Sequence, residues 1–309
     1  MERVWFLTKI VVMISKKIKN TLELVKFSHT VFVLPFALSA FLLAFYIKFP
    51  SEINTYFFYY KILWVVIAMA SARSGAMAFN RIIDAKIDAQ NDRTKSRTLP
   101  KGELSMLYSI IFGLISYAVL IFSAHELNFL CFALSPFVIV FITFYSFTKR
   151  FTFFSHFVLG ASMAFGPIGA WIAVTGSVDY KIIVLGTAVL LWGAGFDILY
   201  ATMDYDFDVA HNLFSVPAKF GIKNAVIISR VLHIATIGLL VYIYFVFNLN
   251  YLYIAGLFLI AGFFIYEHYL IYKSLKNIDM AFFNMNGYIS LSFFLFITVS
   301  VLSRIFLKF

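Results

Sequence analysis

The sequence predicts an all-α, polytopic membrane protein with about nine transmembrane helices. Of its 309 residues, 62% are hydrophobic and 20% are aromatic, whereas only 13% are charged. Soluble globular domains carry about 25% charged residues, so this composition is typical of a chain that lies in lipid. The apolar residues also come in windows of about 20, the length that crosses a bilayer as a helix.

Nine such windows follow one another along the chain. The third and fourth are separated only by the segment AHELN at 124–128. No low-complexity tract interrupts the series, so residues 1–309 are expected to form a single domain. The windows lie near residues 28–47, 62–80, 104–124, 127–147, 156–176, 182–203, 225–247, 251–272 and 287–307.

Residues 1–26 precede the first window and combine lysines with apolar side chains. Lys16, Lys17 and Lys19 accompany Trp5 and Ile10, and no small-residue cleavage site follows the short apolar core. This pattern does not resemble a cleaved signal peptide. It predicts an amphipathic helix that lies on the membrane surface.

The positive charges fall in alternate connecting segments. Eighteen of the 25 Lys and Arg residues lie on the side of the N-terminus and five on the opposite side. The positive-inside rule therefore predicts a cytoplasmic N-terminus. It also explains the net charge of +10 without a nucleic-acid partner. The single cysteine, Cys131, excludes an internal disulfide and a cysteine-cluster metal site.

Two acidic motifs stand at the ends of apolar windows. Asn80, Asp84 and Asp88 recur every fourth residue, so on a helix they span about 80° of one face. In the second motif, on a continuous helix, Asp197, Asp204 and Asp208 would fall within about 40° of one another, whereas Asp206 would point away. The expected orientation places both motifs on the cytoplasmic side.

Facing carboxylates repel one another unless cations lie between them. Oxygen ligands without nearby His or Cys favour Mg²⁺, which completes its coordination with water and substrate phosphate. Solvated helix ends are the simpler explanation for a single Asp, but two matched motifs at membrane depth favour a site. We therefore expect Mg²⁺ and a lipid-soluble substrate that carries phosphate.

Basic residues follow the first motif and the fourth window. Metal ions together with Lys and Arg bind diphosphates and stabilise the charge of a leaving diphosphate. Positive-inside loops contain such residues in any case, so only their convergence with the acidic motifs indicates a function. The residues are Arg93, Lys95, Arg97, Lys101, Lys149 and Arg150, with Tyr145 beside the last two.

The motifs resemble those of the UbiA family of membrane prenyltransferases. Asn80, Asp84 and Asp88 match its N-x-x-x-D-x-x-x-D motif. Its second motif, D-x-x-Y-x-x-x-D-x-x-x-D in the quinone branch, is matched by residues 197–208, with Tyr200 as the tyrosine. Family-like segments occur in the same order along nearly the whole chain.

The resemblance implies helices around a central cavity with a side opening to lipid. It also implies an aromatic prenyltransferase, in which a polyprenyl group passes with Mg²⁺ from its diphosphate to an aromatic acid of the 4-hydroxybenzoate type, in quinone biosynthesis. The protein would be a multi-pass protein of a bacterial inner (cytoplasmic) membrane. Residues 97–100, Arg-Thr-Leu-Pro, are closer to a subgroup in menaquinone synthesis, so a hydroxynaphthoate acceptor stays open.

In this scheme, Asp84, Asp88, Asp204 and Asp208 hold Mg²⁺ and, with Lys149, take part in catalysis. The diphosphate and the acceptor would be bound by residues around them. Tyr145 and Tyr200 could stabilise an allylic cation through their ring faces. The expected substrate-binding residues are Asn80, Arg73, Arg93, Arg97, Tyr145, Arg150, Asp197 and Tyr200.

Three weaker signals lie within the windows. Arg73 projects about 20° from Asn80 and would either hold an acceptor carboxylate or neutralise the aspartates. The glycine-rich segment 160–176 predicts a kinked, closely packed helix. His29, His156 and His233 are interpreted as hydrogen-bonded packing residues.

An ion-coupled transporter is the alternative from another class, because intramembrane aspartates also bind ions. A transporter favours acidic residues near mid-span. Here they lie at the cytoplasmic ends with phosphate-binding cations, which favours the enzyme.

Overall fold

The computed structural model describes residues 15–26, 32–49, 55–274, 278 and 281–307. This part of the chain is helical and contains no strand, as expected. Its helices are α2 (Leu34–Lys48), α3 (Thr55–Gln90), α4 (Met106–Leu127), α5 (Phe129–Thr148), α6 (Ser155–Thr175), α7 (Tyr180–Ala201), η2 (Thr202–Asp204), α8 (Tyr205–Ala210), α9 (Val216–Val246), α10 (Tyr251–Lys273), η4 (Ala281–Met285) and α12 (Asn286–Leu307).

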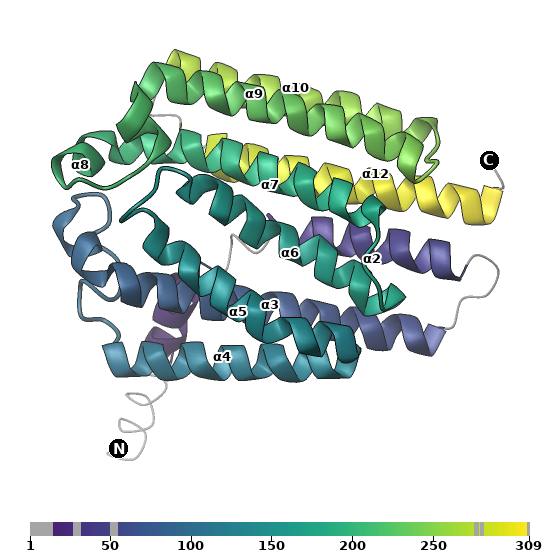
Figure 1. Ribbon diagram of the computed structural model, residues 1–309, viewed down its shortest axis with the longest axis horizontal. Helices are drawn as coiled ribbons and strands as arrows, with labels where there is room; N and C mark the ends of the chain where they lie inside the picture. The colour runs from purple at the N-terminus through teal and green to yellow at the C-terminus, as the bar shows by residue number, and fades with distance from the viewer. Residues whose placement is uncertain (1–14, 27–31, 50–54, 275–277, 279–280, 308–309) are drawn as a thin grey trace, which may run out of the picture.

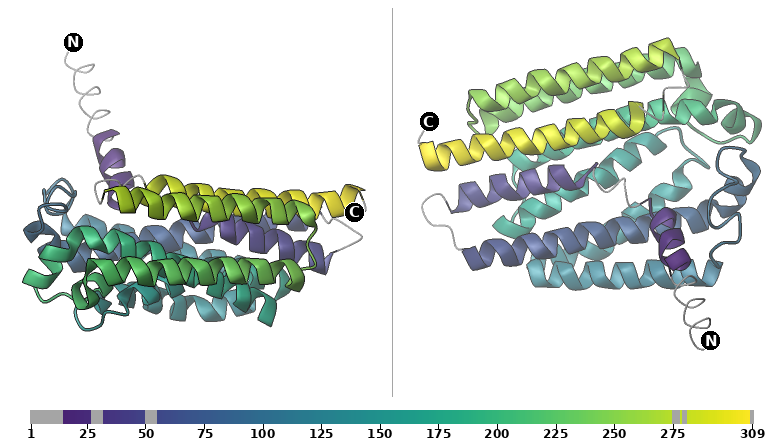
Figure 2. Two further views of the ribbon diagram at one scale, coloured as in Figure 1. Left: turned by 90° about the horizontal axis from the view of Figure 1, so that it is seen from above. Right: turned by 180° about the vertical axis from the view of Figure 1, so that it is seen from behind.

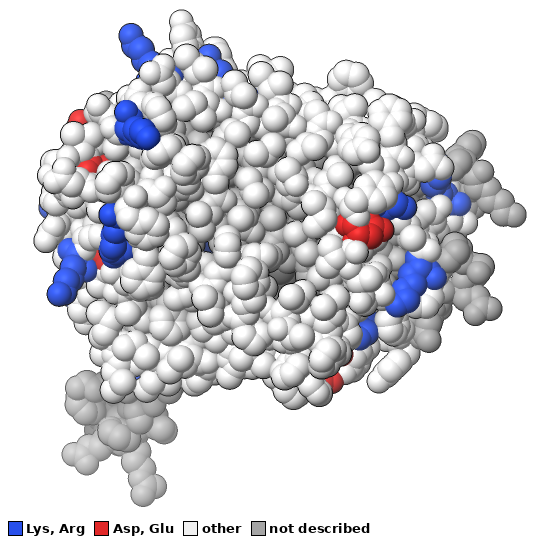
Figure 3. Space-filling view, viewed as in Figure 1, with Lys and Arg blue, Asp and Glu red and all other residues white. Residues whose placement is uncertain are grey.

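Eight helical segments within the described residues are long and apolar enough to cross a membrane. The first expected span appears instead as the shorter apolar helix α2, of 15 residues. This helix would be about 22 Å long, less than the ~30 Å hydrocarbon core. The prediction of a polytopic, all-α membrane protein is confirmed. Charged side chains on the face shown in Figure 3 gather toward the two ends, with an uncharged band between them.

The long helices run side by side (Figure 1), and their contacts close into a ring. Around the ring, α2, α3, α4, α5, α6, α7, α9, α10 and α12 each pack against the next, and α12 packs against α2 again. Additional contacts of α2 with α6 and α7 cross the ring and divide it. One half of the ring is therefore filled by side chains, whereas the other half is enclosed by α3, α4, α5 and α6.

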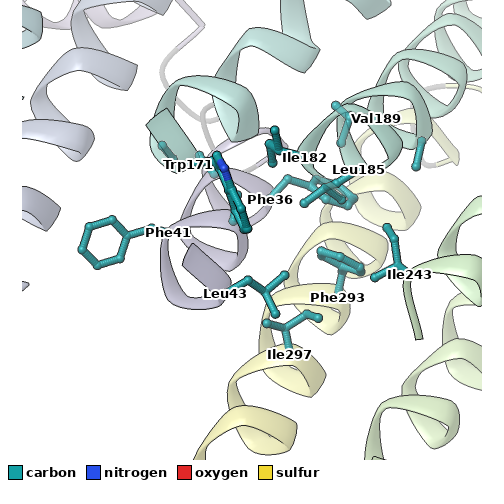
Figure 4. Packing of buried hydrophobic residues seen from close by; sticks show 14 of the residues in the cluster. Phe36, Phe41, Leu43, Trp171, Ile182, Leu185, Val189, Ile243, Phe293 and Ile297 are labelled. Carbon is teal, nitrogen blue, oxygen red and sulfur yellow. The ribbon is translucent and has the colours of Figure 1, made fainter. Parts of the chain in front are cut away.

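The filled half forms the main hydrophobic core (Figure 4). Phe36 of α2 lies 4.9 Å from the ring centre of Trp192 and 4.8 Å from that of Phe293. Both partners of Phe36 are less than 2% exposed, so these large rings fix α7 and α12 around α2. Close aromatic pairs of this kind contribute about 0.5–1.5 kcal/mol beyond area burial.

Polar side chains cap the first turns of three helices. Asn128 separates α4 from α5, and its side chain accepts a hydrogen bond from the amide of Cys131. Ser105 caps α4 and Ser215 caps α9 in the same manner. Such residues are strongly favoured at N-caps because they satisfy unpaired amides of the first turn.

Residues 15–24 form a helix at the end of the molecule that carries α8. In Figure 2 it projects sideways from the bundle, across the direction of the spans. Thr21 forms a 2.9 Å hydrogen bond with Tyr108, and Leu24 is buried against Ala78 and Leu104. The rest of the expected surface helix, residues 1–14, lies outside the described residues, as does His29.

Candidate active site

The first acidic motif lies on one continuous helix, as predicted. Helix α3 has 36 residues, so it would be about 54 Å long and extends beyond the hydrocarbon core. Its last turns carry Asn80, Asp84 and Asp88, and the two aspartates are only 4% and 3% exposed. Thr94 donates a hydrogen bond to the carbonyl of Asp88 at 3.0 Å, which folds the following loop back over the motif.

The second motif is not on one continuous helix, so the predicted 40° arc is wrong. Helix α7 ends at Ala201, and the chain tightens into the 3₁₀ turn η2 before α8. The hydroxyl of Thr202 donates to the carbonyl of Leu199 at 2.7 Å. The backbone amide of Thr202 also donates to the carbonyl of Leu199, which is the i to i−3 spacing of a 3₁₀ turn. Asp197 therefore lies on α7, Asp204 in η2 and Asp208 on α8, whereas Asp206 is exposed.

Asp84 is bound by two cations from the α5–α6 connection. Lys149 donates to one carboxylate oxygen at 2.8 Å and Arg150 to the other at 3.0 Å, while Asn80 approaches at 3.3 Å. Arg150 also donates to the carbonyls of Ser146 and Ile83, at 2.6 and 2.9 Å. Arg150 is thus anchored to two helices, whereas Lys149 is held by the carboxylate.

Asp88 is bound by two arginines. One terminal nitrogen of Arg97 lies 2.7 Å from both carboxylate oxygens. Arg81, itself 8% exposed, lies 4.0 Å away. A buried carboxylate is costly unless it is paired, and these two guanidinium groups provide the compensation.

Asp204 is bound from the loop after α3. The Nε of Arg93 donates to it at 2.8 Å, and a second guanidinium nitrogen binds its other oxygen. Asn91 donates at 2.8 Å. Burial lowers the pKa of Arg93, but its hydrogen bonds to Asp204 and Tyr200 and their charges outweigh burial and raise the pKa above its ordinary value. The bond from Arg93 to the Tyr200 hydroxyl is 2.8 Å.

Three of the motif carboxylates are thus paired with Lys or Arg. Among the described residues, most of these partners are the basic side chains that the sequence assigned to the phosphates. Lys95 instead pairs with the exposed Asp92, and Lys101 is also exposed. The predicted basic cluster is therefore reduced to Arg93, Arg97, Lys149 and Arg150, with Arg81 added.

The described residues contain no group of three or more His, Cys, Asp or Glu side chains that could hold one metal ion. Mg²⁺ usually binds through one or two carboxylates and takes its other ligands from water and substrate phosphate. Oxygen-only pairs such as Asp84 with Asp88, or Asp204 with Asp208, fit that requirement. They do not resemble a preformed, all-protein metal site.

Asp197 has a different partner from the other motif aspartates. Its carboxylate lies 2.7 Å from Nδ1 of His156, a residue of α6 that is 3% exposed. Asp208 lies beside Ser215, with Asp204 and Lys149 near enough for their charges to act on it. His156 was predicted to be a packing residue, but the structure brings it to the acidic motif.

An apolar cavity of about 430 Å³ begins at the polar cluster. It is lined mainly by α3, α4, α5 and α6. Asn80 and Tyr145, near the ends of α3 and α5, stand at its polar end, and Arg73 lies farther along α3 within it. The cavity also reaches Leu127 and Cys131, which lie at the ends of α4 and α5 away from the acidic motifs. It therefore runs along most of the bundle. The surface in Figure 3 is hollowed near its middle.

Arg73 is half-buried among the apolar side chains of this cavity. Its Nε is buried and has no hydrogen-bond partner among the described residues. A guanidinium donor in apolar surroundings is costly when unpaired. The cavity therefore offers an anion-binding donor about 10 Å, or seven residues, along α3 from Asn80.

The glycine-rich helix α6 serves both packing and the cavity. A Cβ at Gly160 would lie 2.2 Å from the backbone oxygen of Leu190, so α6 and α7 touch there. At Gly169 nothing lies within 4 Å of such a Cβ, and this residue lines the cavity. Of these two glycines, the prediction of close packing is correct for Gly160 only.

Three residues of the site were not predicted from the sequence. Arg81 precedes Asp88 by seven residues, the spacing that was recognised between Arg73 and Asn80, so the signal was present. His156 gave no such signal, because its contact depends on how α6 crosses α7. Asn91 adjoins the first motif but carries no charge that would mark it.

Comparison with known proteins identifies the chain by family. Residues 32–297 match the UbiA prenyltransferase family. A 4-hydroxybenzoate octaprenyltransferase from Vesicomyosocius okutanii is 28% identical over 78% of this chain and 88% of its own length. A mitochondrial 4-hydroxybenzoate polyprenyltransferase from Dictyostelium discoideum is 32% identical over 51% of this chain, but the match spans only 34% of that protein.

Solved structures give the same result for the fold. A UbiA homolog from Aeropyrum pernix K1 superposes with a TM-score of 0.78 at 29% identity, covering 88% of this chain and 97% of its own. A UbiA homolog from Archaeoglobus fulgidus, solved with GPP and Mg²⁺ bound, has a TM-score of 0.67 at 18% identity and covers 90% of this chain and 99% of its own. The second likeness is one of fold alone.

Proposed function

The chain belongs to the UbiA prenyltransferase family, and from this premise we propose that it transfers a polyprenyl group from polyprenyl diphosphate to an aromatic acid of the 4-hydroxybenzoate type. The reaction would serve respiratory quinone biosynthesis and depend on Mg²⁺. The names of the Vesicomyosocius and Dictyostelium relatives support the acceptor. Membership of this family replaces the transporter alternative.

One observation carries the proposal: a cluster of carboxylates and cations opens directly into an apolar cavity. Asn80 belongs to both, because it contacts Asp84 and also lines the cavity. A polyprenyl diphosphate has the matching chemistry, with a charged head and a hydrocarbon tail. The tail would occupy the cavity and leave the bundle through its side, while the head stays among the charged residues.

The four aspartates of the metal site, Asp84, Asp88, Asp204 and Asp208, would hold Mg²⁺ together with the diphosphate. Bound Mg²⁺ would supply Lewis-acid stabilisation of the leaving diphosphate. The ion pairs indicate how the charges would rearrange: Arg93, Arg97 and Lys149 would turn from the carboxylates to phosphate oxygens. Arg150 has less freedom, because backbone carbonyls also hold it.

The acceptor would enter beside the diphosphate. Arg73, with its unpaired Nε among the described residues, would bind the carboxylate of the aromatic acid. When the C–O bond of the donor breaks, the ring faces of Tyr145 and Tyr200 would stabilise the allylic cation. The acceptor ring then forms the new C–C bond and loses a proton, and the apolar cavity excludes the water that would otherwise capture the cation.

We further propose that the protein lies in a bacterial inner membrane with its N-terminus in the cytoplasm. The excess of Lys and Arg on that side supports this orientation. The helix at residues 15–24 would lie on the membrane surface as part of the predicted amphipathic segment. Its sideways projection in Figure 2 and its exposed lysines support this position.

The proposal is tested with membranes that contain the protein, labelled polyprenyl diphosphate and either 4-hydroxybenzoate or a hydroxynaphthoate. A prenylated benzoate should form only when Mg²⁺ is present. Product from the naphthoate alone would correct the acceptor, and no product from either acceptor would overturn the proposal. Asp84→Ala and Asp204→Ala should abolish turnover.

The chain offers a matched control for these variants. Asp206 lies between Asp204 and Asp208 in sequence but is exposed. Asp206→Ala should keep full activity. Equal losses in Asp204→Ala and Asp206→Ala would contradict the assignment of the metal-binding carboxylates.

A further inference from the structure

We propose that His156 is a positioning residue that fixes the carboxylate of Asp197 for the transfer reaction and couples it to the start of α9. The proposal rests on the function proposed above and adds a residue that no sequence motif marks. His156 lies on the first turn of α6, whereas Asp197 lies near the end of α7. The hydrogen bond between His156 and Asp197 therefore connects α6 to α7 at the edge of the site, and we call this contact the His156 junction.

The hydrogen bonds define the protonation of the imidazole. The amide of Val216 donates to Nε2 of His156 at 3.2 Å. A ring nitrogen that accepts an amide hydrogen carries no proton of its own, so the ring is neutral and Nδ1 bears the hydrogen. Nδ1 therefore donates to Asp197 at 2.7 Å. The backbone of α9 thus sets the tautomer that holds the carboxylate.

The His156 junction also includes the connection between α8 and α9. The amide of Phe214 donates to the carbonyl of Lys149 at 2.7 Å, two residues before Val216 bonds His156. Because Lys149 also binds Asp84, the connection links both acidic motifs. His156 is buried at this junction, so its contacts are shielded from competing water.

Asp197 differs chemically from the other motif carboxylates because of this partner. Asp84, Asp88 and Asp204 are paired with Lys or Arg side chains that a diphosphate can attract away. The neutral His156 has little reason to move toward phosphate. It binds one carboxylate oxygen of Asp197 and leaves the other oxygen as an acceptor.

Because Asp197 is held by His156 and not by a Lys or Arg that would turn to phosphate, we assign this second oxygen to the transfer step rather than to donor binding. Tyr145 lines the polar end of the cavity, where the reacting carbons would meet. A loosened Asp197 should therefore slow the reaction without weakening the binding of the diphosphate. Loss of an orienting partner of this kind typically costs about 10- to 100-fold in activity.

The test compares His156→Leu and His156→Gln in the prenyl-transfer assay. Leu fills similar space and removes both hydrogen bonds. Gln can donate from its amide nitrogen to Asp197 and accept from Val216 with its oxygen. We expect His156→Leu to lower kcat about 10- to 100-fold, with the KM for polyprenyl diphosphate changed less than about twofold, and His156→Gln to recover most of kcat.

The control is His125→Leu. It removes an exposed imidazole near the C-terminal end of α4, at the end of the bundle away from the acidic motifs, and should leave kcat unchanged. Melting temperatures of the purified variants separate positioning from folding. Unchanged kcat in His156→Leu would overturn the proposal, as would a loss that follows the amount of folded protein and is not recovered by Gln. An inactive wild-type protein would instead overturn the proposed function, and this inference with it.

Discussion

Replacing Arg97 by Met should destabilise the protein because it leaves a buried carboxylate without its main partner. Arg97 donates to both oxygens of Asp88 at 2.7 Å, and the Asp88 side chain is only 5% exposed. Met keeps much of the aliphatic stem and removes the charge. The exposed pair of Asp92 and Lys95, in the same loop, provides the matched control because its side chains are 93% and 60% exposed.

Breaking a buried ion pair by removing one partner costs about 3–5 kcal/mol. Arg81 remains 4.0 Å from Asp88, and the Arg97 side chain is 21% exposed, so part of that cost is recovered. We expect Arg97→Met to lower the free energy of unfolding by about 2–3 kcal/mol. Lys95→Met should produce no measurable change, since solvent screens its pair.

The free energies are measured by denaturant titration in detergent micelles for Arg97→Met, Asp88→Asn and the double variant. The double variant should be more stable than the sum of the single losses predicts, because the neutral amide that replaces the Asp88 carboxylate no longer needs a cation. A coupling energy of about 2 kcal/mol is expected for groups in such direct contact. Equal stability of Arg97→Met and Lys95→Met would refute the reasoning.

Four other substitutions probe the packing and the cavity. Gly160→Ala should destabilise the protein by about 1–3 kcal/mol, because the new methyl group meets the Leu190 backbone. Gly169→Ala should leave the stability unchanged. Thermal unfolding compares the two variants, and equal melting temperatures would contradict the close packing of α6 on α7 at Gly160. Arg73→Leu should raise the KM for the aromatic acid while the KM for polyprenyl diphosphate stays constant, and an unchanged acceptor KM would remove Arg73 from the acceptor site. Ala124 of α4 lines the cavity, so Ala124→Trp should fill part of it and slow transfer of long polyprenyl chains more than of short ones. Equal slowing would show that the tail lies elsewhere.

The spans and the first motif could be predicted because they depend on local pattern. Apolar windows follow from the sequence pattern, and the break between α4 and α5 falls within the segment 124–128 that separates two of these windows. Asn80, Asp84 and Asp88 share a face because α3 continues without a break to Gln90. Spacing on a regular helix was sufficient for this part of the site.

The second motif could not be placed by spacing, because the helix ends inside it. The chain tightens into the 3₁₀ turn η2 after Ala201, and this change of helix type determines where Asp204 and Asp208 lie relative to Asp197. The D-x-x-Y-x-x-x-D pattern does not reveal that the helix ends within it. The constant rotation per residue of an α-helix therefore no longer applies after Ala201.

The pairing of charges and the position of the cavity depend on contacts between distant helices. Arg93 and Arg97 were identified as site residues, but their partners Asp204 and Asp88 could not be assigned before the loop was seen to fold back. The cavity lies among α3–α6 because α2 crosses the ring and packs on α6. The contact between His156 and Asp197 has the same origin.

The central claim is that the two acidic motifs bind the donor as a complex with Mg²⁺. It is tested most directly by measuring the affinity of the purified protein for polyprenyl diphosphate, by calorimetry, with Mg²⁺ and with a chelator. Binding should be strong only with Mg²⁺, be lost in Asp84→Asn and Asp204→Asn, and persist in Asp206→Asn. Equal affinity with and without Mg²⁺, or equal effects of all three substitutions, would contradict the claim.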